Sequence, residues 1–410
     1  MELMTKQGDA LSLPKGYKQT EVGLIPEDWD VNLLSNVVNN ISSGKSNTSN
    51  ESGDYILYGS TGKIGKKFYY DYKGTKILVA RVGANAGNLY KVSGNYCVSD
   101  NTLMLSFNDD FDINYFFYYL NYFNLNKLVF GSGQPLITGG QLKVLQIPVP
   151  STLTEQKAIA TALSDVDALI TSLEQTITKK KAIKQGAMQQ LLTPPHKGGK
   201  RLPGFSGEWV EKTLGDVGVC IRGVTYSGDS DLYPFDNSDS TRLLRSNNVF
   251  DKNIVIKNLQ YVKKEKVKSH QIMKSKDILI CMANGSKALV GKAGQFNGAS
   301  MQYTFGAFMG IFRPNIDEWD GDFLFNLFST NLFRCHLDIQ LSGSSINNLN
   351  PSDIEDFKFH IPSNPEQKAI AQILSDMDAE ITQLETKKEK YQAIKQGMMQ
   401  ELLTGKTRLV

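Results

Sequence analysis

The chain contains one long stretch twice. Residues Glu155 to Thr193 return as a near copy at Glu366 to Thr404. At a constant offset of 211 residues, the two copies are identical at 26 of 39 positions. EQKAIA opens both copies, LSD follows, and AIKQG leads into MQ and LLT near the end. Two unrelated core helices rarely repeat side chains at this density, so we interpret the copies as two versions of one element.

Composition predicts that each copy is a helix. Neither copy contains a proline, and strong helix formers dominate both; the only glycines are Gly186 and Gly397. Apolar residues recur in steps of three and four, an average of about 3.5 residues that is typical of a seam between two helices. The predicted seam consists of Ile159, Leu163, Val166, Ile170, Leu173, Ile177, Ile370, Leu374, Met377, Ile381, Leu384 and Tyr391, with Lys388 as an interruption. A helix of this length measures about 58 Å, more than one small domain needs, so we expect the copies to pair with each other in antiparallel fashion.

The repeat divides the chain into the order domain, helix, domain, helix. A tryptophan followed five residues later by leucine opens both halves, at Trp29 and Trp209. Three prolines in the linker end the first helix. We expect a first domain at 1–150, a first helix at 151–193, a linker at 194–206, a second domain at 207–362, a second helix at 363–404 and a tail at 405–410.

The two globular blocks barely match in sequence, yet their predicted elements follow the same plan. Each has a buried strand, a glycine-rich loop, a later strand and an aromatic-rich helix. The first block has these at 76–80, 81–87, 101–107 and 114–123, and the second at 277–281, 284–294, 307–312 and 323–333. We therefore predict an α+β protein in which two globular α/β recognition domains are separated by two long helices packed as an antiparallel coiled coil, with pseudo-two-fold internal symmetry. Two similar helices that carry two divergent globular blocks are typical of a protein that binds two different ligands.

Composition excludes several classes of protein. With 410 residues, 40% hydrophobic content and a net charge of +3, the chain is soluble and globular, and any nucleic-acid surface must be a local patch. The four cysteines form no CxxC, which argues against a disulfide framework and a zinc site. No secretory signal and no run of 18 apolar residues is found, so we expect a cytoplasmic, non-membrane protein.

Motifs for catalysis are also missing from the sequence. The only Pro-Pro, at 194–195, lacks the flanks that an adenine methyltransferase motif requires. Between Gly285 and Gly291-Lys292 lie five residues where a P-loop has four, and Ala293 replaces the required hydroxyl. The four histidines show no metal-ligand spacing, and acidic residues on the long helices are usually a solvated or partner-facing flank. We predict no catalytic, cofactor or metal site in this chain.

At the repeated motifs the chain resembles the specificity subunits of type I DNA restriction and modification systems. The resemblance covers essentially the whole chain and rests on the EQKAIA entry, the LSD-x-D step and the AIKQG-to-LLT exit, each found twice. It implies that each globular block reads one half of a split site in double-stranded DNA. It also implies that the paired helices act as a spacer and dock two adenine methyltransferase subunits that use S-adenosylmethionine. An ATP-dependent nuclease subunit, with ATP and Mg, would complete the complex.

Basic and amide side chains in the blocks are the candidate DNA contacts. Around a glycine-rich hairpin, lysines neutralise phosphate and small residues allow backbone N–H groups to approach it. Arginine, asparagine and glutamine present the paired hydrogen bonds that read base edges. The candidates are Ser60, Thr61, Lys63, Lys66, Lys67, Arg81, Asn85, Asn88 and Gln134 in the first block, and Arg242, Arg245, Ser246, Asn247, Asn248, Asn284, Ser286 and Lys287 in the second. The aromatic runs at 115–119 and 323–328 are, at helical spacing, more typical of core than of base stacking.

Two other interpretations stay open from the sequence. The main alternative is a non-catalytic coiled-coil scaffold whose globular domains bind protein or carbohydrate, which the low net charge favours. The other is a self-contained nuclease or methyltransferase, which the missing motifs argue against. The DNA-reading hypothesis predicts an asymmetric target of two short half-sites about one DNA turn apart, separated by base pairs that are not read.

Overall fold

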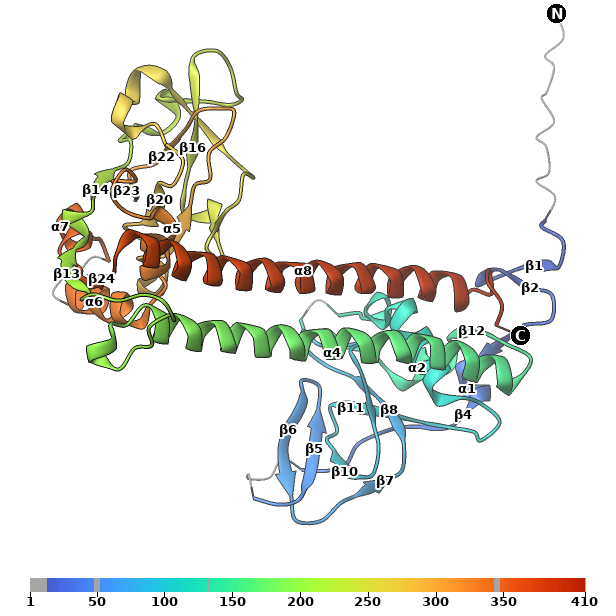
Figure 1. Ribbon diagram of the computed structural model, residues 1–410. Helices are drawn as coiled ribbons and strands as arrows, with labels where there is room; N and C mark the ends of the chain where they lie inside the picture. The colour runs from blue at the N-terminus through green and yellow to red at the C-terminus, as the bar shows by residue number, and fades with distance from the viewer. Residues whose placement is uncertain (1–12, 48–51, 132, 343–346, 410) are drawn as a thin grey trace, which may run out of the picture. The chain divides into compact units, whose positions relative to one another are not determined.

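The computed structural model describes residues 13–47, 52–131, 133–342 and 347–409. Two compact units make up the chain. Unit 1 comprises Met1–Gln175 and Glu385–Val410, and unit 2 comprises Thr176–Leu384. Figure 1 shows that each unit combines a globular α/β part with portions of two long helices. Unit 1 is therefore assembled from two segments that lie far apart in the sequence, whereas unit 2 is one continuous segment.

The long helices confirm the prediction from the repeat. Helix α4 spans Leu153–Leu191 and helix α8 spans Asn364–Leu402. In unit 1, ion pairs join the start of α4 to the end of α8: Asp167 with Lys395 at 2.6 Å and Glu174 with Lys388 at 3.9 Å. Between these two pairs one residue number rises by seven while the other falls by seven, which is an antiparallel register with a heptad step.

Unit 2 contains the opposite portions of the same helices, and they also pair in antiparallel fashion. Lys180 contacts Glu380 at 2.6 Å, and Lys184 is ion-paired with Asp378. The pairs Asp167–Lys395 and Lys184–Asp378 are related by the sequence offset of the repeat. One contact type, a lysine of AIKQG against the second aspartate of LSD-x-D, thus recurs in both units.

Unit 1 has two four-stranded sheets and two strand pairs. Their orders are β4-β11-β8-β9 and β6-β5-β10-β7, with pairs β1-β2 and β12-β3. The strands are β1 (Tyr17–Thr20), β2 (Gly23–Pro26), β3 (Asp30–Leu33), β4 (Val38–Ser43), β5 (Tyr55–Gly59), β6 (Gly62–Lys67), β7 (Tyr72–Lys73), β8 (Lys76–Ala80), β9 (Leu89–Val92), β10 (Asn95–Val98), β11 (Thr102–Phe107) and β12 (Gln146–Val149). Three short helices and a 3-10 turn accompany them: α1 (Leu34–Val37), α2 (Ile113–Phe123), η1 (Leu125–Leu128) and α3 (Gly139–Lys143).

Unit 2 repeats this topology with additions. Its sheets have the orders β14-β23-β20-β21-β18-β17 and β15-β19-β16-β22, and β13 pairs with β24. The strands are β13 (Val210–Thr213), β14 (Gly218–Arg222), β15 (Leu232–Tyr233), β16 (Ser240–Leu244), β17 (Val249–Phe250), β18 (Asn253–Ile254), β19 (Gln260–Lys263), β20 (Ile278–Cys281), β21 (Ala293–Gln295), β22 (Tyr303–Phe305), β23 (Met309–Pro314) and β24 (Lys358–Ile361). Helices α5 (Gly321–Leu327), α6 (Asn331–Ser342) and α7 (Pro351–Glu355) complete it. Among the described strands, the parallel pairs are β5 with β10 in unit 1, and β16 with β22 and β18 with β21 in unit 2.

The hydrophobic cores explain why the two long helices have similar sequences at their ends. In unit 1, Leu163 near the start of α4 packs in one buried cluster with Trp29 and with Leu403, which follows α8. In unit 2, Leu374 near the start of α8 packs with Leu192 and Trp209. The aromatic residues of α2, among them Tyr115 and Phe116, are buried in the unit 1 core, as their helical spacing predicted.

Two predicted elements of the second block are wrong in detail. A single helix was expected at 323–333, but α5 ends at Leu327 and α6 begins at Asn331. The break occurs because the Thr330 hydroxyl donates to the Leu327 carbonyl and accepts a hydrogen bond from the Phe333 N–H, so it caps a new helix. The strand expected at 307–312 is β23, two residues later.

Candidate nucleic-acid interface

In unit 1, three loops that follow core strands meet with a fourth loop that precedes α3. Hydrogen bonds connect them in series: the Ser60 hydroxyl donates to the Asn101 carbonyl at 2.7 Å, and the Arg81 N–H donates to the same carbonyl at 2.9 Å. The Ile137 N–H then donates to the Arg81 carbonyl at 2.9 Å, which brings in the loop that carries Gln134. We call this region, formed by 59–62, 81–88, 99–101 and 133–137, the unit 1 loop cluster. It gathers most of the candidate residues of the first block on one surface.

Within this cluster the 81–88 loop is tightly held. The Gly87 N–H donates to the Ala80 carbonyl, and the Ala80 N–H donates to the Asn88 carbonyl, both at 2.8 Å. Gly87 has φ +91°, and a Cβ there would lie 2.3 Å from the Asn126 Oδ1 atom, so this position requires glycine. Asn88 also donates through its amide to the Asn85 Oδ1 atom at 3.2 Å. The loop therefore presents its side chains from a fixed backbone.

The basic hairpin is formed by β5 and β6, with Ser60 and Thr61 between the strands. Lys63 and Lys66 on β6 are exposed, whereas Lys67 is half-buried and ion-paired with Asp71 at 3.4 Å. Directly after β6, the rings of Phe68, Tyr69 and Tyr70 are 67%, 81% and 45% exposed. Lysines beside exposed aromatic rings suit a backbone that carries both phosphates and stacked bases.

Unit 2 has a corresponding loop cluster, formed by the loops that follow the equivalent strands β16, β20 and β22. The Met282 N–H donates to the Phe308 carbonyl at 2.9 Å, as Arg81 does to Asn101 in unit 1. The Gly306 N–H donates to the Leu244 carbonyl at 3.0 Å, and the Asn284 N–H donates to the Asn347 carbonyl at 3.2 Å. We call 244–248, 282–287, 306–308 and 347–349 the unit 2 loop cluster. Its backbone plan matches that of unit 1, but its side chains differ.

The structure separates the second-block candidates into available and engaged side chains. Asn247 and Ser286 are exposed, Ser246, Arg245 and Asn284 are half-buried, and Lys287 is exposed at 3.9 Å from Asp338. Asn248 is fully buried: its amide donates to the Val255 and Lys257 carbonyls at 2.9 and 2.8 Å, and its Oδ1 atom accepts from the Arg245 N–H. Arg242 is ion-paired with Asp236 and lies over the Tyr303 ring. Asn248 thus departs from our expectation, since its side chain is buried and its amide is used to hold the loop.

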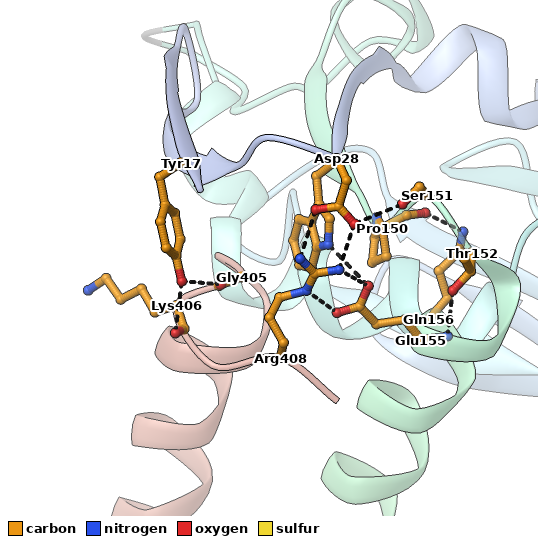
Figure 2. A network of polar contacts seen from close by, with 11 residues as sticks. Tyr17, Asp28, Pro150, Ser151, Thr152, Glu155, Gln156, Gly405, Lys406 and Arg408 are labelled. Carbon is orange, nitrogen blue, oxygen red and sulfur yellow. Dashed lines mark hydrogen bonds and ion pairs between the residues drawn. The ribbon is translucent and has the colours of Figure 1, made fainter. Parts of the chain in front are cut away.

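A buried polar arrangement, which the sequence analysis did not identify, lies at the start of α4. Glu155, the first residue of EQKAIA, is 1% exposed and accepts hydrogen bonds from Arg408 at 2.5 and 2.9 Å and from the Trp29 Nε1–H at 3.2 Å. Arg408 also donates to both carboxylate oxygens of Asp28, at 2.7 and 2.8 Å. Figure 2 shows Arg408 between the two carboxylates. We call these four residues the helix-start cluster of unit 1. Hydrogen bonding from Arg408 lowers the pKa of the Asp28 carboxyl below its usual value of 3.8.

Unit 2 contains the counterpart at the start of α8. Glu366 is fully buried and accepts a hydrogen bond from Arg201 at 2.7 Å. Arg201 follows α4 in a Lys-Arg-Leu stretch, as Arg408 follows α8 in Lys-Thr-Arg-Leu. The second residues of the motif also match. Gln156 and Gln367 accept from the N–H of Asp112 and Asp320, the residues that cap α2 and α5, at 2.9 and 3.0 Å. These repeated Lys-Arg-Leu-like stretches were the sequence signal that could have revealed the pairing.

The predicted helix seam is buried or half-buried throughout. Ile159, Leu163, Ile170, Leu173, Ile177, Ile370, Leu374 and Ile381 are buried, and Val166, Met377, Leu384 and Tyr391 are half-buried. The first two residues of each series also belong to the cores of the globular parts. The start of each series is therefore part of the core of a globular part, while ion pairs join the two long helices farther along.

Among the described residues, no group of three or more His, Cys, Asp or Glu side chains is arranged to hold a metal ion. Cys97, Cys220 and Cys281 are buried free thiols, and Cys335 is an exposed one. No helix among the described residues combines the length and apolar character that crossing a membrane needs.

Comparison with known proteins then defines the class. The sequence profile described as "Type I restriction modification DNA specificity domain" matches residues 26–185 and 206–396, which together cover most of the chain in two repeats. The chain belongs to this family of DNA-specificity proteins, whose role is recognition rather than catalysis.

Particular relatives support this assignment. The specificity subunit of the EcoKI type I restriction enzyme of Escherichia coli is 30% identical over 48% of this chain, but the match spans only 42% of that protein. The putative MjaX specificity subunit of Methanocaldococcus jannaschii is 25% identical over 96% of this chain and 97% of its own length. The fold is similar to that of the type I system S subunit from M. genitalium, with a TM-score of 0.62 and 16% identity over 91% of this chain and 96% of that one.

Proposed function

We propose that this chain is the DNA-specificity subunit of a type I restriction-modification complex, in which each unit reads one half of a bipartite, asymmetric target. The observation that supports this proposal is the pair of loop clusters. Each unit presents loops after equivalent strands on an equivalent backbone, yet one cluster carries Gly59, Arg81 and Asn101 where the other carries Arg245, Met282 and Phe308. Two readers with one architecture and different side chains recognise two different short sequences.

In this proposal the chain supplies recognition, and its partners supply chemistry. Two methyltransferase subunits would bring S-adenosylmethionine to an adenine in each half-site. ATP-dependent nuclease subunits, with ATP and Mg, would join the complex for cleavage. The chain itself would bind neither cofactor.

The decisive experiment maps methylated adenines in genomic DNA from host cells with and without this chain. We expect methylation that depends on the chain and falls on one asymmetric sequence with two defined parts around a gap of fixed length. A continuous target that tolerates insertions at its centre would contradict the proposal. The scaffold alternative predicts that no methylated sequence disappears with the chain, and purified complex would then show no sequence preference in duplex DNA.

Docking of two copies of one partner is supported by the repeated AIKQG segments. Ile183 in unit 2 and Ile394 in unit 1 are equivalent by the repeat offset and are 47% and 39% exposed. Gly186 and Gly397 have open space around the position of a Cβ, with nothing within 4 Å. An exposed isoleucine one turn from a glycine without neighbouring side chains allows another helix to approach closely. The chain has this surface twice, once in each repeat. We assign it to the methyltransferase subunits.

Single and double substitutions test this docking. Gly186→Leu should remove one methyltransferase subunit from the purified complex, Gly397→Leu should remove the other, and the double variant should remove both. Subunit stoichiometry by native mass spectrometry is the measurement. Gln185→Leu, at an exposed position of α4 that faces away from Ile183 and Gly186, serves as the matched control. Full stoichiometry in the double variant would place the partner elsewhere.

The paired helices would also set the unread gap. Inserting four residues into both α4 and α8 lengthens each by about 6 Å, close to two base-pair rises. The preferred gap should lengthen by about two base pairs while the half-site letters stay the same. If the gap were unchanged, the helices would not determine the spacing.

A further inference from the structure

Arginine usage in this chain singles out two residues. The chain has eight arginines, all within the described residues. Five are paired with carboxylates: Arg201, Arg242, Arg313, Arg334 and Arg408. A sixth, Arg222, donates to the Asn348 and Asn350 side chains and to the Leu349 carbonyl. The remaining two, Arg81 and Arg245, have no carboxylate partner among the described residues.

Arg81 is the more isolated of the two. Among the described residues, no group accepts a hydrogen bond from its guanidinium, and its Nε atom is shielded from water without a partner. Arg245 has the same unpartnered Nε atom and a single long hydrogen bond, 3.4 Å, from Nη2 to the Asn258 carbonyl. Native proteins rarely leave buried donors unsatisfied, so these guanidinium groups are suited to an acceptor from outside the chain.

Hydrogen bonds fix the backbone of both arginines, while their guanidinium groups have no carboxylate partner among the described residues. The Arg81 N–H and carbonyl are both hydrogen-bonded, to Asn101 and to Ile137. The Arg245 N–H donates to Asn248, whose own N–H returns a hydrogen bond to the Arg245 carbonyl at 2.9 Å. Each arginine directly follows a core strand, β8 in unit 1 and β16 in unit 2. This is the preorganisation that a side chain needs to discriminate between bases.

Given the proposed DNA-reading function, on which this inference rests, we propose that Arg81 and Arg245 each read a guanine, one in each half-site. A guanidinium fork matches the O6 and N7 acceptors on the major-groove edge of guanine, and no other base edge offers two acceptors there. The alternative for an unpaired arginine is a phosphate contact. The exposed lysines of the basic hairpin are suited to such contacts in unit 1, and a phosphate contact does not need a fixed backbone.

The test is sequence selection from a random duplex DNA library by the complex purified from host cells through a tag on this chain. We expect a guanine in each half-site of the wild-type target. Arg81→Gln should reduce the preference for guanine by about tenfold or more at one position of one half-site, with adenine gaining there, and should leave the other half-site unchanged. Arg245→Gln should do the same in the other half-site only.

Controls distinguish the possible outcomes. Lys63→Gln should weaken binding equally for all sequences and reduce the salt dependence of the binding constant by about one phosphate contact, with the same selected target. Arg81→Lys keeps the charge and guards against a folding defect, which thermal melting would report; it should retain the salt dependence but discriminate guanine less. If Arg81→Gln behaves like Lys63→Gln, Arg81 contacts phosphate and the inference is wrong. If the wild-type complex selects no sequence at all, the proposed function itself fails.

Discussion

At the scale of single residues, the first two positions of EQKAIA are structural in both units. Glu155 and Glu366 are buried acids, each held by an arginine that follows the other long helix. A buried carboxylate is costly unless it is paired and hydrogen-bonded. Each glutamate–arginine pair therefore strongly favours the arrangement in which the segment after one long helix lies beside the start of the other. Glutamine at the next position ties the same helix start to the capping residue of α2 or α5.

Arg408→Met should therefore destabilise unit 1. The substitution leaves Glu155, which is 1% exposed, without its cation, and we expect a loss of about 3 kcal/mol in the free energy of unfolding. The double variant Glu155→Gln with Arg408→Met should recover part of that loss. Chemical denaturation is the measurement. Lys180→Met is the control, because it breaks an exposed ion pair and should cost less than about 1 kcal/mol. Equal losses in the two single variants would show that burial of Glu155 is unimportant.

The Asp28 carboxylate gives a prediction for acid stability. Its pKa is lowered in the folded chain by hydrogen bonding from Arg408, so its contribution is present above the unfolded value of 3.8 and is lost as the pH falls below it. Asp28→Asn should be less stable than wild type at pH 7, and the difference should shrink as the pH approaches 3. Thermal melting across that range measures it. A difference that does not change with pH would mean that charge at Asp28 is not involved.

At the scale of elements, each long helix carries an interior glycine that makes it less stable than a helix with alanine at that position. Gly186 and Gly397 lie inside helices, and glycine costs up to about 1 kcal/mol relative to alanine there. Since no other described residue lies within 4 Å of the position of a Cβ at either glycine, packing among the described residues does not explain these glycines. Their cost fits a surface reserved for a partner.

Gly186→Ala and Gly397→Ala should accordingly raise the stability of the isolated chain. We expect up to about 1 kcal/mol for each substitution, measured by thermal unfolding in the absence of partners. The same substitutions should weaken assembly with the methyltransferase subunits, though less than leucine does. A destabilised isolated chain would indicate a contact that the structure does not contain.

Sequence reasoning predicted the elements well where the pattern is local. The repeat and its apolar rhythm predicted two long helices, which are α4 and α8, and the buried strand predicted at 76–80 is β8. It failed where a distant or single-residue interaction decides. The partner of Glu155 lies 253 residues away, the helix break at Thr330 depends on one hydroxyl, and Asn248 is buried by contacts that no periodicity reports.

At the scale of the whole molecule, unit 1 depends on residues from the far end of the chain. Leu402 and Leu403 fill the core of unit 1, whose other buried members lie before residue 164, apart from Met399. In unit 2, Leu191 and Leu192 at the end of α4 pack in one core with the start of α8. Unit 1 is therefore built from two separate stretches of sequence, whereas unit 2 is one contiguous stretch that begins inside α4 and ends inside α8.

This arrangement predicts crossed effects of core substitutions. Leu403→Ala should destabilise unit 1 by about 2–5 kcal/mol and reduce hydrogen-exchange protection around Trp29, while protection around Trp209 is retained. Leu192→Ala should have the opposite pattern. Hydrogen exchange monitored by mass spectrometry resolves the two regions. Loss of protection confined to the sequence neighbours of each substitution would contradict the crossed assembly.

The strand pairs β3–β12 and β13–β24 have an evolutionary consequence. Because the two strands of each pair are hydrogen-bonded neighbours, the polypeptide enters and leaves a reading block at adjacent points. A gene segment that encodes one block between such strands can be exchanged by recombination without disturbing the buried glutamate, the arginine or the helices around it. New combinations of half-sites can then arise in a single genetic event, without gradual change at individual contacts.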